Sequence, residues 1–118
     1  MRGENSDEME TGPEEVEALL AKDELLVEIV DVREDWELVR GMLPHAVHLP
    51  MSQLIRDQDH WQADRRYIVY CEHGIRSLDV VVWLAQNKGI AAKSMRGGFA
   101  EWHGEIESGA GGSDSGKP

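Results

Sequence analysis

The stretch from Tyr67 to Leu84 places the strongest constraint on the fold of this chain. Its first four residues, Tyr-Ile-Val-Tyr, are β-branched or aromatic and are typical of a buried strand. An apolar run from Leu78 to Leu84 favours a helix, which Asn87-Lys88-Gly89 would end. Only a short, largely polar loop separates the two runs. The stretch therefore predicts a strand, a tight loop and a helix in direct succession.

That loop, Cys71 to Arg76, contains the only cysteine of the protein. A loop between a strand and a helix directs backbone N–H groups and the positive end of the helix dipole at one point. A thiol at that point ionises easily, and Arg76 adds a fixed positive charge. A lone cysteine is otherwise a small buried hydrophobic residue. The local pattern is compatible with a reactive thiolate at Cys71 and leaves the second interpretation open.

Length and charge narrow the classes of function. A chain of 118 residues forms one domain. Its net charge of −11 argues against nucleic acid and anionic membranes as partners, because Lys and Arg make most contacts to phosphates. No apolar run is long enough to span a bilayer, the N-terminal residues do not resemble a signal peptide, and one cysteine cannot form an internal disulfide. We therefore expect a cytoplasmic protein.

The two ends of the chain differ in composition from the middle. Residues 1–11 are mostly polar and acidic, and residues 108–118 are mostly Gly and Ser. Such compositions predict flexible tails. The expected domain therefore comprises residues 12–107.

Predicted strands and helices alternate along this domain. Trp36 and Val39 are expected on the inner side of a short helix. Alternation on this scale predicts an α/β domain with a mainly parallel sheet. The expected strands are residues 25–32, 46–49, 67–70 and 91–95, and the expected helices or helical turns are residues 13–21, 34–40, 52–56 and 78–84, with a last helix beginning at Phe99.

Polar segments follow two of the predicted strands: Asp31-Val32-Arg33 and the Cys71 loop. In parallel sheets, ligands bind outside the carboxyl ends of the strands, so the two segments should share one edge. Arg33 then either supplies positive potential to a site or pairs with Glu34 or Glu37. The sequence leaves both alternatives open.

Four motifs occur in a recognisable order and cover most of the domain, from Pro13 to Trp102. The motifs are Asp31-Val-Arg-Glu, Gly41-Met-Leu-Pro-His-Ala46 before Pro50, Tyr70-Cys-Glu-His-Gly-Ile-Arg-Ser77, and Gly97-Gly-Phe-Ala-Glu-Trp102. With them, the chain resembles a single-domain rhodanese-like sulfurtransferase. The sequence departs from the family pattern at Met42 and His45, which affects a turn rather than the fold.

The resemblance implies a five-stranded, mainly parallel sheet flanked by helices on both faces. It implies that Cys71 takes a sulfane sulfur from an anionic donor such as thiosulfate and holds it as a persulfide. The acceptor would be cyanide or a thiol, which a protein partner could carry. No cofactor and no metal are implied.

The resemblance also assigns roles within the loop. Arg76 would hold the loop closed or attract the donor, and Gly74 would permit the torsions that turn the amides toward Cys71. Ser77 is expected to cap the following helix. We expect the negative charge of Glu72, at the mouth of the site, to weaken thiosulfate binding. The side chains expected to face outward, toward the donor or acceptor, are those of Glu72, His73 and Ile75.

Two other functions compete with this one. Cysteine-dependent phosphatases place five residues between Cys and Arg, whereas this chain has only the four from Glu72 to Ile75. Non-catalytic rhodanese-like modules, which dock proteins, typically lose the cysteine or the arginine, and both are present here. The sulfurtransferase is the favoured prediction.

His45 and His48 would point to opposite faces of a strand, so we do not expect them to bind a metal together.

Overall fold

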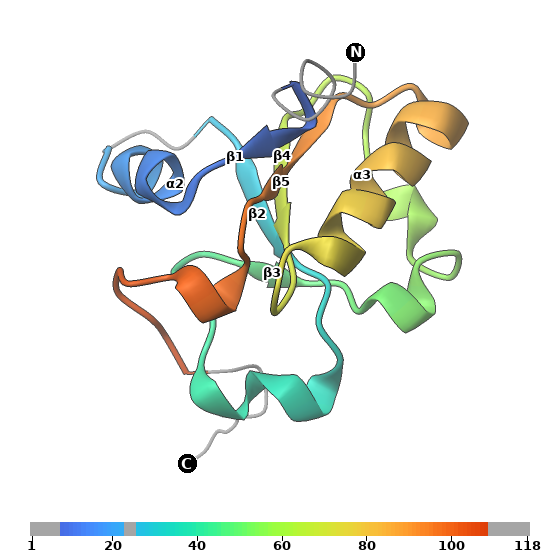
Figure 1. Cartoon of the computed structure of the whole chain (residues 1–118). Helices are drawn as coiled ribbons and strands as arrows, with labels where there is room; N and C mark the ends of the chain where they lie inside the picture. The colour runs from blue at the N-terminus through green and yellow to red at the C-terminus, as the bar shows by residue number, and fades with distance from the viewer. Residues whose placement is uncertain (1–7, 23–25, 109–118) are drawn as a thin grey trace.

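The structure, a computed structural model, describes residues 8–22 and 26–108. Five strands and two helices make up its regular part, and 3-10 helices occupy several connections (Figure 1). In chain order the elements are β1 (Glu10–Thr11), α2 (Pro13–Leu20), β2 (Glu28–Asp31), a 3-10 helix (Asp35–Arg40), β3 (Val47–His48), two 3-10 helices (Met51–Gln53 and Gln58–His60), β4 (Tyr67–Tyr70), α3 (Ile75–Lys88), β5 (Ala92–Met95) and a last 3-10 helix (Phe99–Glu101).

The strands form one sheet in the order β1-β5-β4-β2-β3, and every strand pair within it is parallel. β4 lies at the centre, α2 packs on one face and α3 on the other (Figure 1). The predicted α/β class and the five-stranded sheet flanked by helices on both faces are confirmed. The carboxyl ends of β2 and β4 therefore meet at one edge of the sheet.

Alternate side chains of the strands pack on opposite faces, as the two-residue period of a strand requires. Ile29 and Ile68 lie in the cluster that contains Val16 of α2. Val30 and Val69 lie in the cluster on the α3 side. Because both faces are covered, the central strand β4 is a continuous apolar run, which made it easy to recognise. The α3 residues in the cluster on the α3 side are Val80, Val81 and Leu84.

Local sequence explains where the helices begin and end. Pro13 occupies the first turn of α2, and the Gly12 N–H donates to the Glu15 carboxylate at 2.5 Å. α3 begins directly after Gly74 and ends at Gly89, whose φ of 65° is left-handed. α3 begins earlier than the sequence suggested because the end of the Cys71 loop forms its first turn.

One short strand lies before the predicted domain boundary at residue 12. Glu10 and Thr11, assigned to the acidic tail, form β1 and pair with Ser94 and Met95 of β5. A two-residue edge strand has no sequence signature of its own, because only its hydrogen bonds to the neighbouring strand make it a strand. The rest of the predicted tails, residues 1–7 and 109–118, and Leu25 at the start of a predicted strand lie outside the described residues.

The prediction that Trp36 and Val39 face inward is also wrong. They are 74% and 85% exposed, and Leu38 is the buried residue of the 35–40 segment. This segment is a 3-10 helix, in which residues three apart share a face. Trp36 and Val39 therefore lie on one face together, and that face is turned away from the core.

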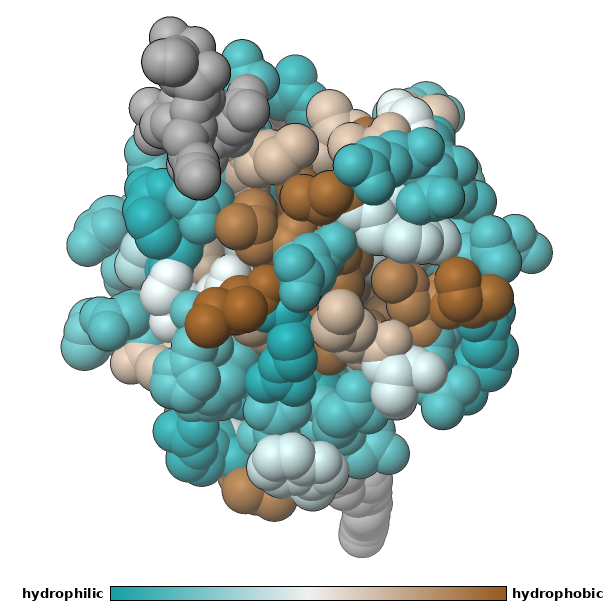
Figure 2. All heavy atoms as spheres, turned by 45° about the vertical axis from the view of Figure 1, so that its right-hand side comes forward, coloured by the Kyte–Doolittle hydropathy of each residue, from teal (hydrophilic) through white to brown (hydrophobic). Residues whose placement is uncertain are grey.

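The surface on the α3 side is mainly hydrophilic, with apolar side chains gathered across its middle (Figure 2). Partly buried residues that pack against the α3-side core, such as Trp83, contribute to the apolar surface of the molecule. Within the described part of the chain, neither helix has the length and apolar character needed to cross a bilayer.

Candidate active site

The Cys71 sulfur lies at the bottom of the loop that joins β4 to α3. Cys71 is 1% exposed. The backbone N–H groups of Gly74 and Ser77 point at Sγ, with nitrogen–sulfur distances of 3.2 and 3.3 Å. The Ser77 hydroxyl oxygen lies 3.4 Å from Sγ. The sulfur is therefore surrounded by donors at the positive end of the α3 dipole, which together favour an anion.

Two opposing effects act on the pKa of the Cys71 thiol. Burial favours the neutral thiol and raises the pKa. Hydrogen bonds from the Ser77 hydroxyl and from the backbone N–H groups of Ser77, His73 and Gly74 favour the thiolate and lower it. The hydrogen bonds prevail, so the pKa of Cys71 lies below its ordinary value. The thiolate is the nucleophilic form of cysteine, so this loop activates the residue.

Gly74 allows the loop to adopt its shape. Its φ of 89° lies in the left-handed region that favours glycine. A Cβ at this position would also lie 2.9 Å from the backbone nitrogen of Gly97. The predicted role of Gly74, turning the amides toward the sulfur, agrees with this torsion.

A second glycine, Gly98, lets another segment support the loop from behind. A Cβ on Gly98 would lie 2.5 Å from the carbonyl oxygens of both Cys71 and Glu72. The same two carbonyls accept hydrogen bonds from the N–H groups of Phe99 and Ala100 at 2.8 and 2.9 Å. The Gly-Gly-Phe motif therefore holds the backbone of the Cys71 loop in place.

Arg76 forms a bidentate ion pair with Glu37. Its Nη1 and Nη2 lie 2.8 and 2.7 Å from the two carboxylate oxygens. This pairing raises the pKa of Arg76 and, despite partial burial, lowers the pKa of Glu37. Arg76 thus ties the start of α3 to the 35–40 helix. Because Glu37 already balances its charge, Arg76 attracts an anion less than a free arginine would.

Arg33 is fully buried and lies in a second ion-pair network. Its Nη2 lies 2.8 Å from Oδ2 of Asp31, and its Nη1 lies 3.3 Å from Oε1 of Glu72. Glu72 also pairs with Arg40. Of the two alternatives left open for Arg33, pairing with the carboxylate of Glu34 or Glu37 is not found, because its position at the end of β2 directs it to its near neighbour Asp31 and across to the loop.

The network also corrects two expectations about the loop. The Glu72 side chain is only 13% exposed and points to the two arginines rather than outward. Ser77 does not cap α3, since Gly74 occupies the cap position. The buried Ser77 hydroxyl instead lies between Cys71 and the buried Ser94, with 2.7 Å between the two serine oxygens. The side chains of His73 and Ile75 are exposed, as expected.

A hollow of about 430 Å³ opens beside the loop. The exposed Trp36 and Val39 line one part of it, although both were expected in the core. A 3-10 period in the sequence would have revealed their shared face, and it would have placed Glu37 and Arg40 together on another. The complete lining is Trp36, Glu37, Val39, Arg40, Glu72, His73 and Arg76.

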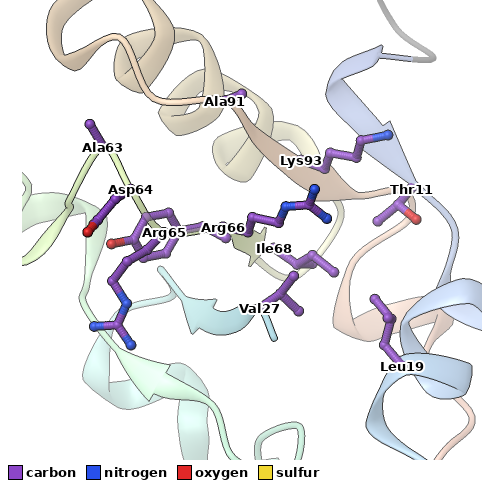
Figure 3. A pocket seen from close by; sticks show the side chains of 11 residues that line it. Thr11, Leu19, Val27, Ala63, Asp64, Arg65, Arg66, Ile68, Ala91 and Lys93 are labelled. Carbon is purple, nitrogen blue, oxygen red and sulfur yellow. The ribbon is translucent and has the colours of Figure 1, made fainter. Parts of the chain in front are cut away.

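A larger cavity, of about 670 Å³, lies at the opposite ends of the strands (Figure 3). It lies near the starts of β4 and β5, where Arg66, Ile68 and Lys93 contribute to its wall. Its lining contains neither cysteine nor histidine. Cys71 and the ion pairs of Arg33 and Arg76 are at the carboxyl ends of the strands, where ligands of parallel sheets bind.

Comparisons with known proteins agree with this geometry. The model of the rhodanese-like domain family matches residues 12–105. YtwF of Bacillus subtilis, whose name gives sulfurtransferase as an inferred activity, is 35% identical over 67% of this chain and 76% of its own. Thiosulfate sulfurtransferase GlpE of Shewanella oneidensis is 31% identical over 65% of this chain and 76% of its own. The crystal structure of a rhodanese-like domain protein from Staphylococcus aureus superposes with a TM-score of 0.77 and 31% identity, covering 85% of this chain and 97% of that one.

Proposed function

The chain belongs to the rhodanese-like domain family, and from that premise we propose that it is a sulfurtransferase in which Cys71 carries the transferred sulfur as a persulfide. The general class is supported by relatives named as sulfurtransferases at 31–35% identity. The single observation that carries the proposal is the Cys71 sulfur surrounded by hydrogen-bond donors.

The proposed reaction has two displacement steps. The Cys71 thiolate attacks the outer sulfur of a donor such as thiosulfate, a new S–S bond forms, and the old one breaks as its electron pair leaves with sulfite. A cyanide or thiolate acceptor then attacks the terminal sulfur of the persulfide and regenerates the Cys71 thiolate. Both thiolate and persulfide are anions, so the N–H groups of Gly74 and Ser77 stabilise the resting enzyme and the intermediate alike.

Loop size favours sulfur over phosphate. Four residues separate Cys71 from Arg76. Transfer of a phosphoryl group requires donors around three equatorial oxygens, with the nucleophile in line behind phosphorus. Arg76 directs one N–H of each terminal nitrogen at Glu37, whose carboxylate already balances its charge. The presence of both Cys71 and Arg76 likewise favours an enzyme over a module that only docks proteins.

Intact-mass analysis tests the proposal. Wild-type protein and Cys71→Ser are incubated with thiosulfate, and aryl-phosphate hydrolysis is measured in parallel. We expect the wild type to gain one sulfur atom, the variant to gain none while keeping its circular dichroism spectrum, and neither to hydrolyse phosphate at a meaningful rate. Efficient phosphate turnover without uptake of sulfur would replace this function with that of a phosphatase. Full sulfur uptake by Cys71→Ser would exclude Cys71 as the carrier.

A further inference from the structure

The charged side chains around the mouth of the Cys71 loop balance one another. Arg76 pairs with Glu37, and Arg40 pairs with Glu72. These four residues supply the fixed charges in the lining of the 430 Å³ hollow, two positive and two negative. An anion that enters the hollow therefore meets arginines whose charge a carboxylate already balances. In such a neutral lining the second charge of a dianion gains little attraction, although a dianion costs more to remove from water than a monoanion.

The same hollow presents apolar surface to the solvent. Trp36 and Val39 both line it, and they are 74% and 85% exposed. Their position on one face of the 35–40 helix places both side chains at the opening. Apolar groups left in water gain free energy when a ligand covers them, and an indole ring pairs well with another aromatic ring. The hollow thus combines balanced charge with an apolar wall.

We propose that this hollow selects sulfur donors that have an apolar organic group and a single negative charge, in preference to the dianion thiosulfate. Trp36 and Val39 would contact the organic group while the sulfur reaches Cys71. This inference rests on the proposed sulfurtransferase function and specifies the substrate class of the same site. Organic thiosulfonates and organic persulfides both have this chemistry.

Thiosulfonates allow a balanced form of the reaction with a single negative charge. The Cys71 thiolate attacks the outer sulfur of benzenethiosulfonate, and the bond between the two sulfur atoms of the donor breaks. The electron pair leaves with benzenesulfinate, and Cys71 becomes a persulfide anion. Two monoanions enter and two leave, and no further oxidant or reductant takes part.

Three donors separate the effect of charge from that of the apolar group. Thiosulfate is a dianion without an organic group, methanethiosulfonate is a monoanion with a small one, and benzenethiosulfonate is a monoanion with a ring. The rate of persulfide formation, kcat/KM, is measured for each donor by mass spectrometry and by release of sulfite or sulfinate. Because intrinsic donor reactivity differs, the informative quantity is the change in the ratio of two donors between wild type and variants.

Trp36→Ala tests the apolar wall. We expect it to reduce the preference for benzenethiosulfonate over methanethiosulfonate by about 2- to 10-fold, the range expected from loss of one aromatic pair. Ile55→Ala is the matched control, because Ile55 is also an exposed apolar residue, at 62%, and does not line the hollow. An unchanged ratio in Trp36→Ala, or an equal change in Ile55→Ala, would overturn the proposal.

Glu72→Gln and Arg40→Gln test the balance of charge in opposite directions. Removing the carboxylate leaves Arg40 free and should raise kcat/KM for thiosulfate relative to methanethiosulfonate. Removing Arg40, which is 61% exposed and easily replaced, should lower that ratio. Equal ratios in wild type and both variants would contradict the role of charge. If none of the three donors adds sulfur to Cys71, the proposed function itself is wrong; if thiosulfate adds sulfur and the ratios stay fixed, only this inference is wrong.

Discussion

At Cys71 the competition between burial and hydrogen bonding decides how much of the thiol is ionised at neutral pH. The Ser77 hydroxyl is the strongest of the groups that lower its pKa, ahead of the backbone N–H groups. The Cys71 thiol can donate to this hydroxyl, but the thiolate can only accept, so the Ser77 hydroxyl can then donate to the sulfur while accepting from Ser94. A side chain that sequence alone suggested as a helix cap therefore acts on the nucleophile.

Ser77→Ala should raise the pKa of Cys71. A thiol with a raised pKa is less ionised at any given pH, so the midpoint of the pH–rate profile for alkylation by iodoacetamide should move to higher pH. The buried Ser94 hydroxyl also loses its partner, which should lower the free energy of unfolding by about 1–3 kcal/mol. Ser52→Ala, which removes a hydroxyl bonded to Glu34, is the control and should not move the midpoint. An unmoved midpoint in Ser77→Ala would contradict the role of Ser77.

At the scale of elements, the site is built where segments distant in sequence meet. The β4–α3 loop provides the nucleophile, the turn after β5 supports the loop backbone, and the 35–40 helix supplies Glu37 and the wall of the hollow. Each contact joins the carboxyl end of a strand to a neighbouring connection. The parallel order of the sheet brings these ends to one edge.

Gly98→Ala should disturb the loop, because its Cβ would lie 2.5 Å from two carbonyl oxygens of the loop. The positive φ of Gly98 combined with its ψ of −163° costs another residue about 1–3 kcal/mol, and overpacking adds about 1–3 kcal/mol. Gly89→Ala is a control for positive φ without the clash, since φ is 65° and ψ is 27° there, and a Cβ at Gly89 would have nothing within 4 Å. Both variants should lose stability in urea unfolding, but only Gly98→Ala should also slow persulfide formation. Equal slowing in both would contradict support of the loop by this turn.

For the whole molecule, the fully buried Arg33 connects several parts of the fold. It pairs with Asp31 at the end of β2 and donates to the backbone carbonyl of Gly41 at 2.6 Å. Its guanidinium carbon lies 4.3 Å from the centre of the Phe99 ring. A buried cation with these partners is stable only while the partners remain in place.

Arg33→Met should therefore destabilise the whole domain, because it leaves the buried Asp31 carboxylate without its cation. Breaking a buried ion pair on one side typically costs about 3–5 kcal/mol. Arg56→Met provides the control: Arg56 pairs with Asp57 but is 64% exposed, and surface pairs contribute about 0–1 kcal/mol. Urea unfolding of the two variants measures the difference. Similar midpoints would show that the Arg33 network contributes little to stability.

Local chemistry in the sequence determined the α/β class, β4, α2 and the place of Cys71 between a strand and a helix. Tyr67–Tyr70 is apolar on both faces, Pro13 and Gly89 mark helix ends, and Cys71 stands where a strand passes into a helix. Each of these signals depends on neighbours in the chain. The resemblance to a family, carried by ordered motifs, added the number of strands.

Only the tertiary structure decided the partners of the charged and exposed groups. β1 is a strand because it pairs with β5. Arg33 pairs with Asp31 and Glu72, although the carboxylates of Glu34 and Glu37 are near it in the sequence. Trp36 and Val39 are apolar and were therefore expected in the core. They are exposed because the segment is a 3-10 helix that buries Leu38, so the face that carries Trp36 and Val39 points to the solvent. Such outcomes depend on which surfaces the fold brings together across the sheet, and the order of residues along one segment does not contain that information.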